Sequence, residues 1–94
     1  MKDKKKLTLI NVDALGLSSR IKLAIDDEQD YYIIKNIKSR IIMSDGKKIL
    51  DISRKIKKKI NATIFLATTA PLCSKTKKYL KENKIETIFD YIIS

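Results

Sequence analysis

The sequence contains no histidine and only one cysteine, Cys73. Histidine is the most common general base in enzymes and a frequent zinc ligand, so its absence removes His-based catalysis and ordinary zinc sites. A single cysteine also excludes an intrachain disulfide. From these absences we expect a protein that is not an enzyme, with no catalytic residues, no metal site and no cofactor.

Glycine and proline are also scarce, since only Gly16, Gly46 and Pro71 occur. Two isolated glycines can form neither a phosphate-binding loop nor a dinucleotide fingerprint. No stretch approaches the roughly 18 apolar residues of a membrane span, and the charged N-terminus lacks the apolar segment of a signal peptide. We therefore expect a soluble, cytoplasmic protein without membrane insertion.

What the sequence does contain is isoleucine and lysine in abundance. A hydrophobic fraction of 44% in 94 residues predicts one folded domain over residues 1–94 rather than a disordered basic tail. The 21 Lys+Arg residues exceed the 11 Asp+Glu residues and give a formal net charge of +10. Arginine contributes only Arg20, Arg40 and Arg54, so this charge is mostly lysine.

Hydrophobic periodicity predicts alternating strands and helices. We expect strands at Lys6–Val12, Tyr31–Ile34, Ile41–Met43 and Ala62–Ala67, and a short closing strand within Ile88–Ile92. We expect helices from Leu17 to the acidic cluster at Asp26, from the Ser44-Asp45-Gly46 turn to Ile60, and from Pro71 to Leu80. This alternation predicts the α/β class, with a central mixed sheet and helices packed on it.

The turn Ser44-Asp45-Gly46 is the most distinctive local motif, because it follows an apolar run and opens a long helix. Two interpretations fit it. Ser44 or Asp45 can simply cap the helix while Gly46 eases the turn. Alternatively, the exposed amides of the helix N-terminus can bind an anion or a phosphoryl group.

Lysine-rich helix faces and Cys73 are the other candidate sites. The second and third expected helices carry Lys47, Lys48, Arg54, Lys55, Lys57, Lys58, Lys59, Lys75, Lys77, Lys78, Lys81 and Lys84. Such faces either bind phosphates or are only solvated surface, and scarce arginines and aromatics leave little for reading bases. Cys73 begins a helix, where a thiolate is stabilised, but it has no resolving cysteine, so a buried or unreactive thiol is the simpler interpretation.

The second half of the chain resembles the STAS family of anti-sigma factor antagonists and sulfate-transporter tails. The similarity rests on Tyr32–Ile34, Ile41–Leu50, Ala62–Ala67, the Pro71-led helix and Ile88–Ile92. It implies a STAS-like sandwich acting as a non-catalytic regulatory or scaffold module. In that family's motif Asp45 occupies the place of the phosphorylated serine, Ser44 the preceding place, and Met43 replaces an aspartate.

The STAS resemblance implies a protein partner, either an anti-sigma kinase or a transporter subunit. We expect it to bind at the turn and on the following helix, through Ser44, Asp45, Gly46, Lys47, Lys48 and Asp51. Ser44 is the candidate phosphorylation site. The lysines would favour an acidic partner and salt-sensitive association.

A second resemblance leads to a different function. Leu15–Arg20 with Asp27-Glu28, and then Ile37–Asp45, resemble segments of the L7Ae/L30e RNA-binding family. The basic charge suits that family, although its Gly-Asn-Glu motif has no match in this sequence. Nucleic-acid binding by the lysine faces is therefore the alternative prediction.

Overall fold

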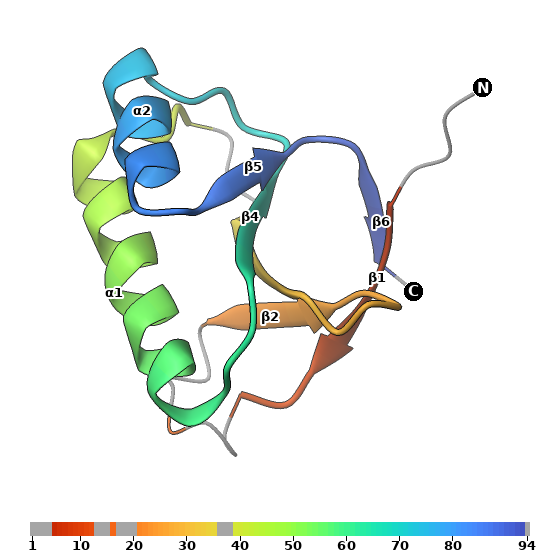
Figure 1. The fold of residues 1–94 in the computed structure, drawn as a ribbon. Helices are drawn as coiled ribbons and strands as arrows, with labels where there is room; N and C mark the ends of the chain where they lie inside the picture. The colour runs from red at the N-terminus through yellow and green to blue at the C-terminus, as the bar shows by residue number, and fades with distance from the viewer. Residues whose placement is uncertain (1–4, 13–15, 17–20, 36–38, 94) are drawn as a thin grey trace.

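The computed structural model describes residues 5–12, 16, 21–35 and 39–93 of the 94-residue chain. Its elements are β1 (Lys5–Ile10), β2 (Lys22–Ile25), β3 (Tyr31–Lys35), α1 (Met43–Lys59), β4 (Ile64–Thr68), α2 (Ser74–Glu82), β5 (Glu86–Ile88) and β6 (Tyr91–Ile93). Both helices lie on the same side of the sheet (Figure 1). The predicted α/β class, with a mixed sheet and helices packed on it, is confirmed. Among the described residues, no helix has the length and apolar character needed to cross a membrane.

The six strands form one mixed sheet in the order β5-β4-β3-β2-β1-β6. The strands β1, β2 and β3 form an antiparallel meander, whereas β3, β4 and β5 run parallel. Parallel neighbours need a crossover connection, and α1 and α2 supply the two crossovers. The last strand, β6, pairs in parallel with β1 at the far edge.

The sheet is strongly curled. β5 and β6 form its two opposite edges, yet only Phe89 and Asp90 separate them in the chain. Such a link spans at most about 11 Å, so the two edges must approach one another. The curl gives the sheet an outer face, covered by both helices, and an inner face that it partly encloses (Figure 1).

Each face of the sheet carries its own hydrophobic cluster, because successive strand residues point to opposite sides. In β4, Ile64 and Leu66 belong to the larger cluster that includes residues of both helices. Phe65 and Ala67 belong to a smaller cluster made only of strand residues and built around Leu7, Ala24 and Tyr32. The central strands are therefore buried on both faces.

The predicted helix from Leu17 to Asp26 is wrong where the structure describes it, since Lys22–Ile25 is strand β2. Leu23 and Ala24 are consecutive and both fully buried, one in each cluster. Only an extended chain between two other strands places adjacent residues on opposite buried faces. Residues 17–20 lie outside the described part of the chain.

Two other predicted segments also differ. Ile41 forms only an isolated bridge with Leu72, and Met43 already begins α1, so Ile41–Met43 is not a strand. The closing segment is two short strands, β5 and β6, instead of one. Strands β1, β3 and β4 and both later helices occur where the sequence predicts them, within a few residues.

Gly46 lies where α1 packs against α2. It is buried, and a Cβ atom at this position would lie 2.9 Å from Cγ2 of Thr76. Thr76 is itself fully buried, so close packing leaves its side chain little room to move away. The glycine therefore permits the close approach of the two helices.

We predict that Gly46→Ala destabilises the protein, by up to about 2 kcal/mol. Overpacking against Thr76 costs about 1–3 kcal/mol, which exceeds the roughly 1 kcal/mol that alanine gains over glycine within a helix. In a Thr76→Ser background, which lacks Cγ2, the same substitution should instead stabilise. Urea unfolding of the four proteins measures both effects, and equal destabilisation in both backgrounds would contradict this explanation.

Candidate functional site

The carboxyl ends of the parallel strands β3 and β4 lie side by side at one end of the sheet. Lys35 and Thr68 are register partners there, and the Thr68 hydroxyl donates a 2.6 Å hydrogen bond to the Lys35 carbonyl. The same hydroxyl accepts the Ala70 amide at 3.0 Å. In α/β sheets, ligands bind outside the carboxyl ends of the strands, so this end of the sheet is the candidate position for a ligand.

Both helices begin at this same end of the sheet. The Ile41 amide donates to the Pro71 carbonyl at 2.9 Å, and the Cys73 amide donates to the Ile41 carbonyl at 3.0 Å. These bonds fix the segments that precede α1 and α2 side by side. Because a helix N-terminus carries partial positive charge, two such termini give this end of the molecule a positive potential.

Three lysines are among the residues that line a small hollow at this end of the sheet, beside α1. Lys22 opens β2 opposite Ile34, Lys35 closes β3, and Lys48 extends from the start of α1. We call Lys22, Lys35 and Lys48 the carboxyl-end lysine cluster. The hollow measures about 80 Å³, and its other described lining residues are the isoleucines Ile21, Ile33, Ile34, Ile49 and Ile52. Among the described residues that line it, none is acidic.

The Ser44-Asp45-Gly46 turn is the first turn of α1. The Asp45 carboxylate accepts the Ile42 amide at 3.3 Å, so Asp45 satisfies one of the amides at the helix start. Gly46 is buried against α2, and Ser44 is exposed. The N-cap is Ile42, so neither Ser44 nor Asp45 is the capping residue, and Asp45 instead bonds back to the N-cap amide from the third helical position. Helix packing accounts for Gly46. Phosphorylation of Ser44 stays a prediction.

The remaining predicted residues lie on the outer surface of α1. Lys47, Lys48 and Asp51 are all exposed, and Asp51 forms an exposed ion pair with Lys55 at 3.4 Å. Only Lys48 of the predicted residues joins the carboxyl-end lysine cluster. Cys73 is half-exposed at the start of α2, where the amides of Lys75 and Thr76 lower the pKa of its thiol despite partial desolvation.

The opposite end of the sheet carries an acidic turn between β2 and β3. The Asp26 side chain makes the central contacts of this turn. Asp26 is 7% exposed, and its Oδ1 accepts the amides of Glu28 and Asp30 at 2.9 and 3.0 Å. Its Oδ2 accepts the Tyr32 hydroxyl at 2.8 Å and lies 3.0 Å from Lys5 Nζ. A single carboxylate therefore joins the turn, β3 and β1.

These contacts shift the pKa of each participant. Burial opposes ionisation of Asp26, but hydrogen bonds from Lys5, Tyr32 and the two turn amides outweigh it and lower the pKa from 3.8 to about 2. Burial and the bond to Asp26 raise the pKa of Tyr32. The bond to Asp26 raises the pKa of Lys5 against a smaller opposing effect of burial. Asp26 is thus a stable anion with four partners.

No local sequence pattern predicts this network. Asp26 was expected only as the end of a helix, and a distance of 21 positions separates it from Lys5 in the chain. The usable signal was the clustering of carboxylates in a segment rich in β-branched and aromatic residues. Carboxylate oxygens of Asp26, Glu28 and Asp30 lie within 4.8 Å of one another, and no other such group occurs among the described residues.

Comparison with known proteins gives similarity of fold only. No family model matches the chain, and no curated protein matches it. A repair endonuclease from Pyrococcus abyssi is similar in structure, with a TM-score of 0.59 and 12% identity over 77% of this chain. The structure of EndoMS in complex with double-stranded DNA has a TM-score of 0.59 and 13% identity over 70% of this chain. The structure of EndoMS in its apo form has a TM-score of 0.63 and 10% identity over 94% of this chain.

This chain spans only 31%, 28% and 37% of those three proteins, respectively. The neighbours correct the STAS assignment, which is wrong. The predicted role as a non-catalytic regulator that binds an anti-sigma kinase or a transporter subunit depended on that assignment and is wrong as well. The expectation that the chain is not an enzyme is contradicted as well, because a part of a repair endonuclease has a similar fold.

We predict that Asp26 makes folding stability depend on pH in the acid range. A depressed native pKa stabilises the fold above the unfolded pKa of 3.8, and this stabilisation is lost as the pH falls through about 2. The shift corresponds to about 2 kcal/mol.

Urea unfolding between pH 5 and pH 2 should therefore show a drop of this size in the wild type. Asp26→Asn should be less stable at pH 5 and should lack the drop. Asp27→Asn, an exposed neighbour in the same turn, is the matched control and should behave as the wild type does. The assignment to Asp26 fails if both variants keep the wild-type profile.

Proposed function

We propose that this chain binds the phosphate backbone of nucleic acid at the carboxyl end of its parallel strands. The observation that carries the proposal is the carboxyl-end lysine cluster, Lys22, Lys35 and Lys48, around a hollow with no acidic lining residue among those described. The two helix N-termini at the same end add positive potential.

The distribution of charge supports a polyanion as the ligand. The acidic turn from Asp26 to Asp30 lies at the other end of β3, so it does not oppose an anion at the lysine cluster. The exposed lysines of α1 and α2 extend the cationic surface beyond the cluster. Binding of this kind releases counterions from the nucleic acid and is therefore weakened by salt.

The fold comparison supports the same ligand class. One similar structure is a complex of EndoMS with double-stranded DNA. Because the similarity is one of fold and covers about a third of that protein, we transfer the ligand class only as part of this proposal. The cationic end of the sheet supplies the chemical reason for it.

We predict that replacing the three cluster lysines by glutamine weakens duplex DNA binding more than an equal loss of charge elsewhere. The control is the triple variant Lys57→Gln, Lys58→Gln and Lys59→Gln, at the far end of α1. Binding is measured by fluorescence anisotropy at several salt concentrations.

The cluster variant should lose about tenfold or more in affinity at 0.1 M salt, and its log–log salt slope should fall by about 2–3. The control should change both quantities much less. Equal effects of the two triple variants would show that only net charge matters and would contradict a specific site.

Cleavage of the bound nucleic acid is the second candidate function, favoured by the fold that this chain shares with a repair endonuclease. Nucleases of many kinds use divalent cations held by carboxylates. Among the described residues, one cluster of carboxylates, that of Asp26, Glu28 and Asp30, could hold such an ion. It fits the ion only in part, because the Asp26 carboxylate already accepts four contacts. We therefore assign no catalytic step to it.

Cleavage is tested directly by incubating labelled duplex and single-stranded DNA with the protein and Mg²⁺ or Mn²⁺. If the lysine cluster positions the substrate for cleavage, its triple variant should lose product formation while the Lys57/Lys58/Lys59 control keeps it. Absence of product with either ion, under conditions where binding is saturated, would count against cleavage and leave the binding proposal intact. A single-domain organisation over residues 1–94 and a cytoplasmic location stay predictions.

A further inference from the structure

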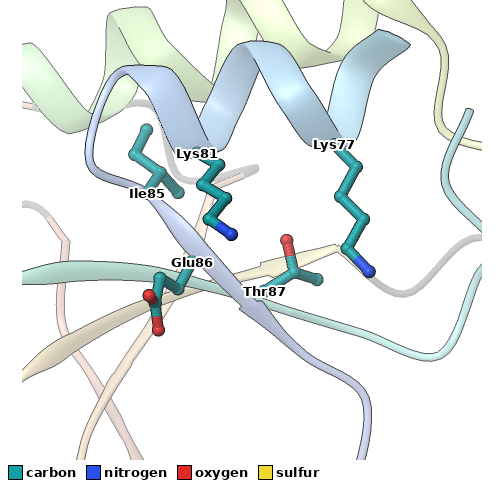
Figure 2. A pocket seen from close by; sticks show the side chains of 5 residues that line it. All are labelled: Lys77, Lys81, Ile85, Glu86 and Thr87. Atoms are coloured by element: carbon teal, nitrogen blue, oxygen red, sulfur yellow. The ribbon is translucent and has the colours of Figure 1, made fainter. Parts of the chain in front are cut away.

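A second cationic surface lies along the open edge of the sheet, between α2 and β5. The side chains of Lys77 and Lys81 extend from α2 toward β5, and the Thr87 side chain lies between them and the strand (Figure 2). Together with Ile85 and Glu86 these residues line a hollow of about 150 Å³. β5 is an edge strand, so no strand of the described residues pairs with one side of its backbone.

A larger hollow adjoins the first and continues around the edge onto the inner face. Its volume is about 440 Å³, and it is lined by Thr63, Phe65, Lys81, Lys84 and Glu86. Lys81 and Glu86 line both hollows, so the two hollows lie next to each other. Phe65 and Glu86 are register partners on neighbouring strands, which puts them on the same face.

Phe65 gives the larger hollow a stacking platform. One side of its ring stacks on Tyr32, with ring centroids 4.9 Å apart and an angle of 17° between the planes. Tyr32 is held in turn by its hydrogen bond to Asp26. Phe65 is only half-buried, and it lines the larger hollow. The ring is therefore fixed on one side and accessible from the hollow.

The groups around Phe65 match the parts of a nucleotide. An aromatic ring stacks on any base, and lysines attract its phosphate. The Glu86 carboxylate and the Thr63 hydroxyl can bond to the polar edge of a base. The hollow of 440 Å³ falls within the range of small-molecule sites.

We propose that these adjoining hollows bind one unpaired nucleotide of a nucleic-acid strand. The base stacks on Phe65 with its edge toward Glu86 and Thr63, and the phosphates lie at Lys81 and Lys77. A base within a duplex is stacked and paired, so only an unpaired nucleotide can enter. The inference rests on the proposed function and names the substrate class that the second surface selects, which is single-stranded nucleic acid.

The test uses a single-stranded oligonucleotide that contains one 2-aminopurine, whose fluorescence is quenched when it stacks on an aromatic ring. The same oligonucleotide in a duplex is the second probe, and 2-aminopurine ribose monophosphate is the third. The third probe distinguishes a nucleotide within a strand from a free nucleotide. All three are titrated into the full chain.

Phe65→Leu should remove the quenching and weaken single-strand binding by about five- to fiftyfold, while duplex affinity stays unchanged. Phe89→Leu is the matched control, since Phe89 is 46% exposed and does not line either hollow. Lys81→Gln, compared with Lys78→Gln on the same helix, is a second test that leaves the packing of Phe65 untouched.

The inference is wrong if Phe65→Leu and Lys81→Gln bind the single strand and quench it as their controls do. If duplex binding still depends on Lys22, Lys35 and Lys48 in that case, the proposed function stands without it. If the wild type binds none of the probes at low salt, the proposed function fails together with the inference. Quenching by the monophosphate alone, with no gain from the strand, would overturn the strand as the ligand.

Discussion

The buried carboxylate of Asp26 connects more of this fold than any other polar group among the described residues. It closes the turn between β2 and β3 through two amides, anchors Tyr32 on the inner face and pairs with Lys5 at the start of β1. Since β1 also pairs with β6, the closing strand is held to the same point. Removing one partner from such a buried network leaves the others unsatisfied, which costs several times more than a surface ion pair contributes.

The same carboxylate has a consequence for the inner face. Tyr32 cannot rotate without losing its bond to Asp26, so the ring that stacks on Phe65 is fixed in place. A fixed aromatic platform loses less conformational entropy when a ligand stacks on it than a mobile one would. The network that stabilises the turn thereby preorganises the surface along β5. It also concentrates negative charge at that end of β3, away from the carboxyl-end lysine cluster.

The sequence was informative where one face of an element is buried and the other is solvated. Helix α1 shows the clearest case, because its isoleucines recur at helical spacing among lysines. It misled at β2, where burial on both faces removes the alternation and Ile21, Ala24 and Ile25 fall by chance at helical spacing. The curl of the sheet and the contact of Lys5 with Asp26 join residues far apart in the chain, and no local pattern encodes them.

The candidate site was predicted in part for a related reason. Lys48 was identified because it follows a turn of unusual composition, whereas Lys22 and Lys35 are single lysines at strand ends and carry no local signal. Asp45 and Gly46 were candidates because of their residue types. In the structure Asp45 bonds to an amide at the start of α1, and Gly46 allows α1 to pack closely on α2. The STAS resemblance was built on the same common residue types, and the structural neighbours overrule it.

In the proposed binding of nucleic acid, the two cationic surfaces contribute differently to affinity, and this difference bears on which nucleic acid is recognised. Lysine contacts to phosphate carry no sequence information and lose strength as salt rises. Stacking of a base on Phe65 depends on apolar contact and is affected far less by salt. As ionic strength increases toward physiological values, the electrostatic part of the affinity therefore shrinks and the stacking part becomes the larger share. Under this proposal, a chain with few arginines and few aromatics discriminates between paired and unpaired nucleic acid through one well-supported ring, Phe65, and does not need many.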